Sequence, residues 1–199
     1  MKLFYSPASP FARKVRLAAS VRGISNQIEL LATDTMASPP ELLAANPLSK
    51  IPALVRDNGA TLFDSPLICE YLDTVGEAPP LFPASGEARW TALRLQALAD
   101  GMMDAAVAAV YEGRRPVEDA RSANIARQKA AIARALDFAE AEADTLEAPW
   151  TIGSVTLVAV LGYLDFRLGA DGWRTGRPRL AAWYERVSAE PLIAESAPA

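Results

Sequence analysis

The hydrophobic positions in the first third of the chain alternate between short apolar runs and runs with helical spacing. Apolar runs bounded by polar or turn residues predict strands at residues 3–5, 28–31, 49–55 and 61–63. Helical spacing and helix-ending residues predict helices at 10–22, at 39–45 and from about 65 to 75. Asp57-Asn58-Gly59 predicts a tight turn that joins the last two strands into a hairpin. Strands and helices that alternate in this way indicate an α/β unit.

After a proline-rich segment at 76–86 the pattern is helical throughout. Apolar residues recur every three or four positions and predict helices at 87–112, at 120–146 and near 180–187. The segment after Thr151 is apolar all round, which is typical of a helix buried at the centre of a bundle. This change of pattern predicts a domain boundary, with one domain at 1–78 and an all-helical domain at 86–199.

Composition and charge narrow the classes of protein. A chain of 199 residues with 51% apolar residues can bury a substantial core. Its net charge is −4 and its basic residues are scattered, which argues against a nucleic-acid partner. The N-terminus lacks the long apolar segment of a secretory signal, and the most apolar stretch, 157–164, is shorter than the roughly 20 residues that span a bilayer. We therefore expect a soluble cytoplasmic protein with no membrane partner.

Two residue types that carry chemistry are nearly absent. Without any histidine, the chain cannot use a Ser-His-Asp triad, a histidine metal site or histidine acid–base catalysis. The single cysteine, Cys69, can form no disulfide within the chain, which fits a reducing compartment. Because Cys69 lies in an apolar helical pattern, we interpret it as a small packed residue rather than a nucleophile. We expect no metal site.

Two of the predicted helices begin with a hydroxyl group followed by a proline. Ser9 precedes Pro10, and Ser65 lies between Asp64 and Pro66. Proline suits the first turn of a helix, and serine is a preferred cap residue. A helix N-terminus has free N–H groups and a partial positive charge, which favour an anion such as a thiolate or a carboxylate. From these residues alone, Ser9 is either a helix cap only or part of an anion-binding site.

Four motifs occur along the chain in a distinctive order and spacing. They are residues 5–16 (Tyr-Ser-Pro-Ala-Ser-Pro-Phe-Ala-Arg-Lys-Val-Arg), 50–52 (Lys-Ile-Pro), 64–68 (Asp-Ser-Pro-Leu-Ile) and 162–167 (Gly-Tyr-Leu-Asp-Phe-Arg). With these motifs the chain resembles a bacterial glutathione S-transferase over essentially its whole length. The resemblance implies an α/β N-terminal thioredoxin-like domain that holds glutathione as a cosubstrate. It also implies an all-α C-terminal helical bundle that supplies much of a second, apolar substrate pocket.

The resemblance assigns roles in glutathione binding to five residues. Pro52 would follow a cis peptide bond, which leaves the backbone of Ile51 free to pair with the cysteinyl part of glutathione as an added strand would. Asp64 would bind the ammonium group of the γ-glutamyl end, and Ser65 its carboxylate. Lys50 would reach the glycyl carboxylate. From the residues alone, Pro52 also fits the first position of a strand, and Lys50 also fits an ordinary exposed lysine.

Ser9 matches the reactive position of the family. As a serine it would donate a hydrogen bond that stabilises the thiolate of glutathione, whose thiol has a pKa of about 8.5 when free. Glutathione itself would then be the nucleophile. Tyr5 and Ser6 are hydroxyl groups close by in the sequence, so the identity of the donor stays open among the three.

The second-substrate pocket is the least defined part of the prediction. By position, the candidates for its wall are Phe11, Met102, Met103 and Tyr111. Methionine and aromatic residues at helical spacing are also typical of a packed core.

These residues predict a cytoplasmic glutathione transferase that joins the glutathione thiolate to an apolar electrophile, as in detoxification. The alternatives are a glutathione-dependent peroxidase or isomerase that uses the same site, and a non-catalytic glutathione-binding, ligand-binding or interaction protein of the same fold. The resemblance also implies a homodimer. Trp90, Arg89 and Leu93, on the helix after Glu87, are expected to supply part of the subunit contact.

Overall fold

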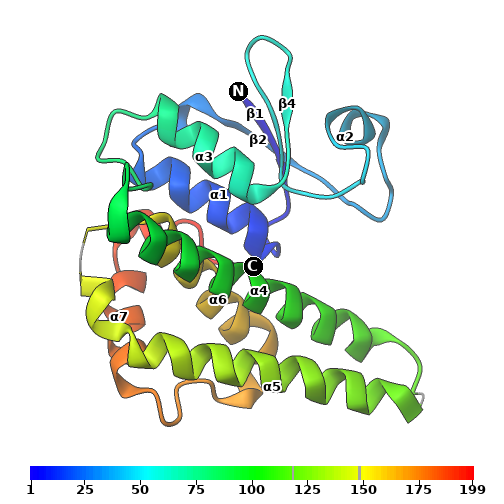
Figure 1. The fold of residues 1–199 in the computed structure, drawn as a ribbon. Coiled ribbons are helices and arrows are strands. Elements are labelled where there is room, and N and C mark those ends of the chain that lie inside the picture. Colours follow the sequence, from blue (N-terminus) through cyan, green and yellow to red (C-terminus); the bar gives the residue numbers. More distant parts are fainter. Residues whose placement is uncertain (118, 148) are drawn as a thin grey trace.

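The computed structural model of the protein describes residues 1–117, 119–147 and 149–199. Four strands form its N-terminal sheet: β1 (Lys2–Tyr5), β2 (Glu29–Ala32), β3 (Ala53–Val55) and β4 (Thr61–Leu62). The strand order is β2-β1-β3-β4 (Figure 1). β1 runs parallel to β2 and antiparallel to β3, and β4 runs antiparallel to β3.

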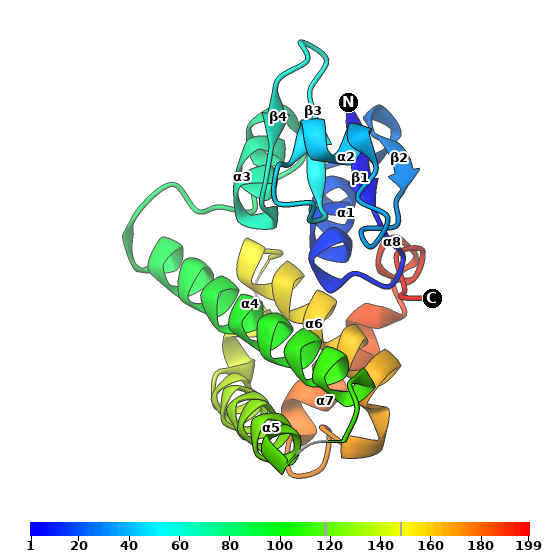
Figure 2. The same ribbon diagram turned by 90° about the vertical axis from the view of Figure 1, so that its right-hand side faces the viewer.

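Helices cover both faces of this sheet. They are α1 (Pro10–Val21), α2 (Pro40–Ala45) and α3 (Ser65–Val75), with a short 3-10 helix, η1 (Ser25–Gln27). Figures 1 and 2 show α1 and α3 on one side of the sheet and α2 on the other. Successive strand residues point to opposite faces. Leu3 therefore joins the core under α1 and α3, whereas Phe4 packs with Leu42 of α2.

A loop replaces the first part of the strand predicted at 49–55, because β3 begins only at Ala53. The side-chain amide of buried Asn46 donates to the Lys50 carbonyl oxygen at 2.9 Å. Its Oδ1 atom accepts from a backbone N–H group two residues further on, at 3.0 Å. Pro52 has no N–H group to donate to a neighbouring strand. The segment before β3 is thus folded by its own polar contacts and stays outside the sheet.

The C-terminal part of the chain is helical, as the pattern predicts. Its elements are α4 (Gly86–Arg114), α5 (Asp119–Ala141), η2 (Ala143–Glu147), α6 (Ile152–Leu168), η3 (Gly169–Asp171), α7 (Pro178–Ser188) and α8 (Pro191–Ala194). The single helix predicted at 120–146 is divided into α5 and η2, and α8 was not predicted. α8 packs against α1, so the end of the chain returns to the sheet domain (Figure 2). The α/β domain followed by a helical domain is confirmed.

α6 is the central helix of the helical domain. Every residue from 152 to 164 is buried, as expected for a helix that is apolar all round. A Cβ atom at Gly153 would lie 2.7 Å from the Ala92 carbonyl oxygen, so this glycine allows α4 to approach closely. The apolar stretch is longer than residues 157–164, the stretch that the sequence indicates. Residues Ile152–Asp171, with a mean hydropathy of 1.4, are numerous and apolar enough to cross a membrane. Of the most apolar part of this stretch, however, 72% is buried inside the protein.

Charged side chains of α1 join the two domains. Lys14 is fully buried, and its Nζ atom donates to both carboxylate oxygens of Asp100 on α4, at 2.9 and 2.8 Å. The guanidinium group of Arg13 donates to the Val158 carbonyl oxygen of α6 at 3.3 Å, and to Ser196 Oγ in the C-terminal tail at 3.4 Å. These contacts hold α1 against α4, α6 and the tail.

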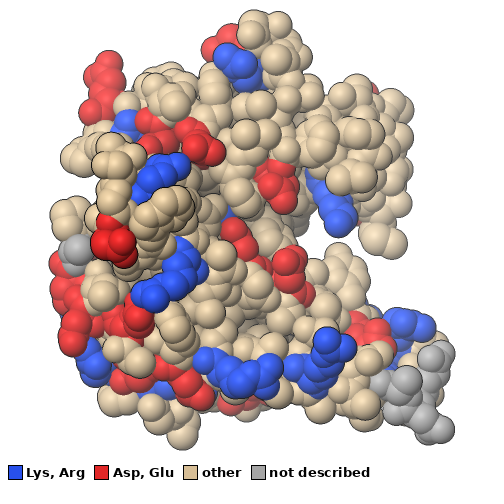
Figure 3. Space-filling model, in the orientation of Figure 1, with Lys and Arg blue, Asp and Glu red and all other residues tan. Residues whose placement is uncertain are grey.

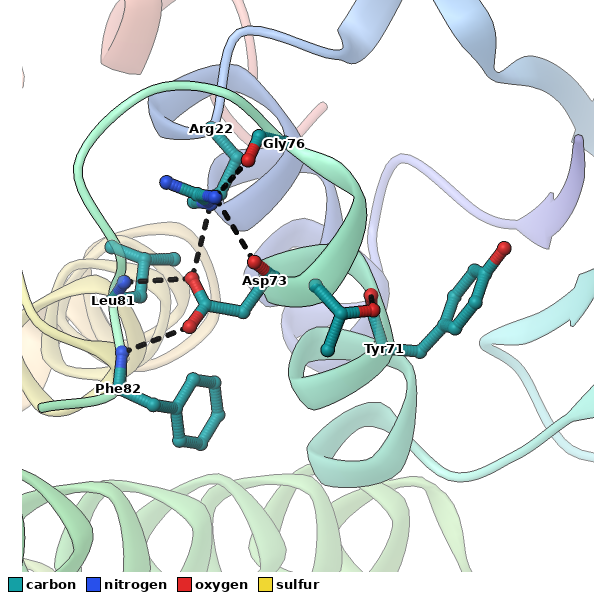
Figure 4. Close-up of polar contacts among 7 residues, drawn as sticks. Arg22, Tyr71, Asp73, Gly76, Leu81 and Phe82 are labelled. Carbon is teal, nitrogen blue, oxygen red and sulfur yellow. Dashed lines mark hydrogen bonds and ion pairs between the residues drawn. The ribbon is translucent and has the colours of Figure 1, made fainter. Parts of the chain in front are cut away.

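The segment between α3 and α4 is also fixed by charge (Figure 4). The Asp73 carboxylate accepts the backbone N–H groups of Leu81 at 2.7 Å and Phe82 at 3.2 Å. Arg22 pairs with the same carboxylate at 3.1 Å and donates to the carbonyl oxygens of Asp73 and Gly76. Arg22 lies at the end of α1, Asp73 near the end of α3, and Leu81 and Phe82 in the connection to α4. These contacts define the path of the chain into the helical domain.

Candidate functional site

A cavity of about 550 Å³ lies between the two domains. Its walls come from the turn between β1 and α1, the loops on either side of α2, the C-terminal half of α4, and α6. The lining residues are Ser6, Ala8, Ser9, Pro10, Phe11, Thr35, Met36, Leu48, Ser49, Lys50, Ile51, Asp104, Val107, Tyr111 and Tyr163. Figure 3 shows the surface hollowed between the part that carries α2 and the far end of α4, with basic side chains on both sides.

Ser9 caps α1 and faces this cavity. Its backbone is extended, with φ −86° and ψ 119°, and its Oγ atom accepts the Ala12 N–H group at 3.2 Å. Pro10 occupies the first helical turn, as predicted. A serine hydroxyl has one donor and two acceptor positions, so the cap leaves the proton of Ser9 available to a group in the cavity. Ser9 can therefore act as both a cap and a hydrogen-bond donor.

The structure separates the two other candidate hydroxyl groups. Ser6 lines the same cavity as Ser9, and its Oγ atom accepts the Ala8 N–H group at 3.3 Å. Tyr5 does not line this cavity, and its ring lies beside the guanidinium group of Arg16, 5.4 Å from the ring centre. Of the three candidate hydroxyl donors, Ser6 and Ser9 line the cavity and Tyr5 does not.

Lys50, Ile51 and Pro52 form the opposite side of the cavity. Lys50 and Ile51 line it, and Lys50 is exposed. The Ile51–Pro52 peptide bond is cis, as the resemblance implies, and the Phe63–Asp64 bond is cis as well. Because β3 begins after Pro52, the backbone of Ile51 is outside the sheet. An extended ligand in the cavity can reach it.

Asp64 and Ser65 mark the N-terminus of α3 but do not line the cavity. Asp64 is exposed, and its carboxylate makes no hydrogen bond or ion pair with any residue that the structure describes. Ser65 is only 1% exposed, yet its Oγ atom has no hydrogen-bond partner among the described residues. Buried hydroxyl groups are almost always paired. An unpaired hydroxyl group at a helix N-terminus could donate to an anion there.

The predicted wall of the second pocket needs one correction. Phe11 and Tyr111 line the cavity. Met102 and Met103, by contrast, are 2% and 0% exposed and belong to the main hydrophobic core. The physical reason is that α4 packs against both α5 and α6, so most of its apolar positions are buried between helices rather than open to a ligand.

Sequence reasoning missed three residues of the same wall: Asp104, Val107 and Tyr163. Asp104 and Val107 lie seven and four positions before Tyr111, which is the spacing of one helix face. That spacing could have found them once Tyr111 was taken as a wall residue. Tyr163 is nearly buried, and its burial raises the pKa of its hydroxyl group, so it remains protonated at neutral pH.

The remaining candidate groups for chemistry are few. Cys69 is fully buried, and burial raises the pKa of its thiol to about 12, so it packs in the core and carries no thiolate at neutral pH. Among the described residues, no group of three His, Cys, Asp or Glu side chains could hold a metal ion. The polar side chains that line the cavity include the hydroxyl groups of Ser6, Ser9 and Tyr163 and the charged groups of Lys50 and Asp104.

Comparison with known proteins agrees with this geometry. Residues 8–75 match the family model of the glutathione S-transferase N-terminal domain, and residues 122–186 match that of the C-terminal domain. The chain is 32% identical to the uncharacterized GST-like protein YibF of Escherichia coli, over 100% of this chain and 98% of that protein.

Solved structures extend the likeness to the whole fold. A glutathione transferase family member from Pseudomonas fluorescens Pf-5, with bound glutathione, is 40% identical and has a TM-score of 0.94, covering 100% of this chain and 98% of that one. A second structure, of a family member from the same source with bound S-(propanoic acid)-glutathione, is 39% identical with a TM-score of 0.91, covering 100% of both chains. The protein belongs to the glutathione S-transferase family.

Proposed function

We propose that this protein is a glutathione transferase that binds glutathione between its domains and joins its sulfur to an electrophile. The observation that carries the proposal is the buried, unpaired hydroxyl group of Ser65 beside the unpaired carboxylate of Asp64. A γ-glutamyl group offers a carboxylate for the first and an ammonium group for the second. Pairing the buried Ser65 hydroxyl would remove a cost that the unliganded protein otherwise bears.

The proposed reaction starts from the thiolate of glutathione. The Ser9 hydroxyl and the N-terminus of α1 favour the ionised sulfur, which lowers the pKa of the bound thiol. The sulfur then attacks the electrophilic carbon, a C–S bond forms, and the leaving group departs with its electron pair. Ser9 contributes no sulfur of its own, so the proposed chemistry needs no protein disulfide.

The ligands of the related structures support this assignment. The Pseudomonas fluorescens proteins hold glutathione in one structure and an S-substituted glutathione in the other. In this proposal Lys50 contacts the glycyl carboxylate and Ile51 the cysteinyl backbone, since both residues line the cavity. Phe11 and Tyr111 would contact the group on sulfur. We propose the cytoplasm as the location, because the one thiol, Cys69, is buried and forms no disulfide, which fits a reducing compartment. We propose detoxification of electrophiles as the role.

Replacing Ser65 with alanine should weaken glutathione binding by about 1.5–3 kcal/mol, since the substitution removes a hydrogen bond to a charged carboxylate. Isothermal titration calorimetry with glutathione measures this change. Ser188→Ala is the matched control, because Ser188 is partly exposed at the end of α7 and its hydroxyl donates to the Glu185 carbonyl oxygen. If the unmodified protein gives no heat with millimolar glutathione, the transferase proposal fails and a role as an interaction protein gains.

We also propose a homodimer. Trp90 on α4 is 62% exposed and Leu67 on α3 is 47% exposed, and an ion pair of 3.8 Å between Arg89 and Glu70 ties the two helices together beside them. Large apolar side chains that stay exposed are typical of an interface core. Sedimentation at micromolar concentration should give a dimer, and Trp90→Glu should give a monomer. Leu43→Glu, at an apolar position of α2 that is 42% exposed, should leave the dimer intact. A monomeric parent protein would contradict this proposal.

A further inference from the structure

One face of α4 presents a stripe of side chains to the space between the domains. Asp104, Val107, Tyr111 and Arg114 follow one another at intervals of three or four residues, so they lie on the same face of the helix. The stripe is about 15 Å long, at a rise of about 1.5 Å per residue. It begins with an acidic group and ends with a basic one.

Two adjoining cavities share this stripe. Asp104, Val107 and Tyr111 line the cavity that also contains Ser9. Tyr111 and Arg114 line a further cavity of about 530 Å³, which is closed on its other side by residues 32–36. The two cavities share Ser6, Thr35, Met36 and Tyr111, so the space beyond Ser9 continues along α4 to Arg114.

The guanidinium group of Arg114 lies beside the Tyr111 ring and has no acidic partner among the residues that the structure describes. Its central carbon lies 5.1 Å from the centre of the Tyr111 ring. A guanidinium stacked on a ring keeps its N–H groups free at its edge. Within the part of the chain that the structure describes, Arg114 forms no ion pair, whereas Arg89 and Arg94 on the same helix each pair with a glutamate.

Among the residues that line the second cavity, Asp34 is the one acidic group. Asp34 lines the same cavity, but its Oδ1 atom accepts the N–H group of Met36 at 2.9 Å. A basic residue in the last turn also interacts favourably with the helix dipole, and this interaction leaves the donor edge unoccupied. The space next to Arg114 therefore combines an aromatic surface with free, oriented N–H donors.

We propose that Arg114 determines substrate specificity by binding a carboxylate on the second substrate. The inference rests on the proposed transferase function and names its substrate class: aromatic electrophiles that carry a carboxylate on the side of the ring away from the reacting carbon. Arg114 pairs with that carboxylate through two N–H groups. The ring lies along Tyr111 and Val107. Asp104, at the other end of the stripe, disfavours the reversed orientation by repulsion.

The carboxylate takes no part in the chemical step. With an aryl chloride, the glutathione thiolate forms the C–S bond, the C–Cl bond breaks, and chloride leaves with the electron pair. The proton of the thiol passes to solvent. The product is an S-aryl glutathione that still carries its carboxylate.

Calorimetry with two S-substituted glutathiones tests the inference without requiring turnover. We expect S-(4-carboxybenzyl)glutathione to bind about tenfold more tightly than S-benzylglutathione, which is the scale of one charge-assisted hydrogen-bonded contact. Arg114→Gln should abolish the preference and leave the affinity for glutathione itself within twofold. Arg114→Lys should retain part of it, because the charge remains and the paired donor geometry is lost. The preference should also shrink at high salt.

Arg127→Gln is the matched control, since Arg127 is an exposed residue of α5 that lines neither cavity. Arg127→Gln removes one positive charge, as Arg114→Gln does, and it should keep the tenfold preference for S-(4-carboxybenzyl)glutathione over S-benzylglutathione. Equal binding of the two S-substituted compounds by the parent protein would overturn this inference alone. A loss of affinity in Arg114→Gln that is equal for the two S-substituted compounds would also overturn this inference alone. No heat with glutathione itself would overturn the transferase proposal, and this inference with it.

Kinetics with 4-chloro-3-nitrobenzoate and 4-chloro-3-nitrobenzamide gives a second readout, each rate being divided by its rate with glutathione in buffer. We expect Arg114→Gln to raise KM for the benzoate about tenfold with little change in kcat, because the contact is the same in the ground state and the transition state. KM for the benzamide should stay within twofold. A fall in kcat for both compounds would instead assign Arg114 a structural role.

Discussion

Ser9→Ala should lower the rate of glutathione conjugation by about 10²–10³, the usual loss when one donor is removed from a preorganised site. Ser9 lines the cavity, and the proton of its hydroxyl group is available because the cap uses only an acceptor position. Without this donor the pKa of the bound thiol should rise, so less thiolate is present at neutral pH. Glutathione affinity should change little, since Asp64 and Ser65 are untouched. Absorbance of the bound thiolate, followed against pH in a stopped-flow instrument, measures the shift.

Two matched variants and one stability measurement separate the roles of this turn. Ser9→Thr keeps both the cap and the donor and should retain most of the activity. Ser6→Ala removes the other hydroxyl group that lines the cavity and should have a small effect if Ser9 is the donor. Loss of the Ser9 cap alone costs about 1 kcal/mol of stability, which thermal unfolding reports independently. If Ser9→Ala leaves the thiolate titration and turnover unchanged, Ser9 is a helix cap only.

Ser9→Cys tests the same position in the opposite direction. A thiol at a helix N-terminus has a lowered pKa and becomes a nucleophile in its own right. The variant should therefore gain thiol–disulfide exchange with glutathione and lose conjugation. A disulfide-reduction assay measures the gain. Cys69 does not interfere, because its thiol is fully buried and its pKa is raised to about 12.

Asp100→Asn should destabilise the protein by about 3–5 kcal/mol, the loss expected when one partner of a buried ion pair is removed. The substitution leaves the ammonium group of Lys14, which is 0% exposed, without a carboxylate. Because Lys14 lies on α1 and Asp100 on α4, the loss weakens the contact between the domains that form the cavity. Equilibrium unfolding in urea measures it.

Two controls make the result specific. Asp171→Asn breaks a pair of similar length, 2.7 Å from Lys129, but both side chains are exposed, so we expect a loss of at most about 1 kcal/mol. The double variant Lys14→Met, Asp100→Leu replaces the buried pair with apolar groups and should regain much of the lost stability. Equal losses for Asp100→Asn and Asp171→Asn would mean that the burial of Lys14 has no energetic consequence.

Local patterns in the sequence were sufficient for the two-part architecture and for the turns at which α1 and α3 begin. Ser9-Pro10 and Asp64-Ser65-Pro66 each begin a helix, as their cap and proline residues predict. α6 is buried all round because its composition leaves it no polar face. The helix starts and the apolar character of α6 depend on residues only a few positions apart. Because the forces that determine them act over this short range, a local pattern in the sequence is enough to predict them.

Tertiary structure decided which faces of the helices meet a ligand. Helical spacing puts Met102 and Met103 on α4 but does not say that they pack in the core while Asp104, Val107 and Tyr111 line the cavity. That distinction depends on where α5 and α6 lie, since a periodic pattern identifies a face and not the element that covers it.

Tertiary structure also decided which residues far apart in the chain come into contact. Lys14 and Asp100 are 86 positions apart and become partners only when the domains pack. The sequence alone determined an α/β part followed by a helical part and the residues at which α1 and α3 begin, because short-range capping and patterning specify them. The resemblance to glutathione S-transferases came from four motifs and their spacing. The unpaired Ser65 hydroxyl and the Arg114 stripe depend on burial and on missing partners, which exist only once the whole chain has folded.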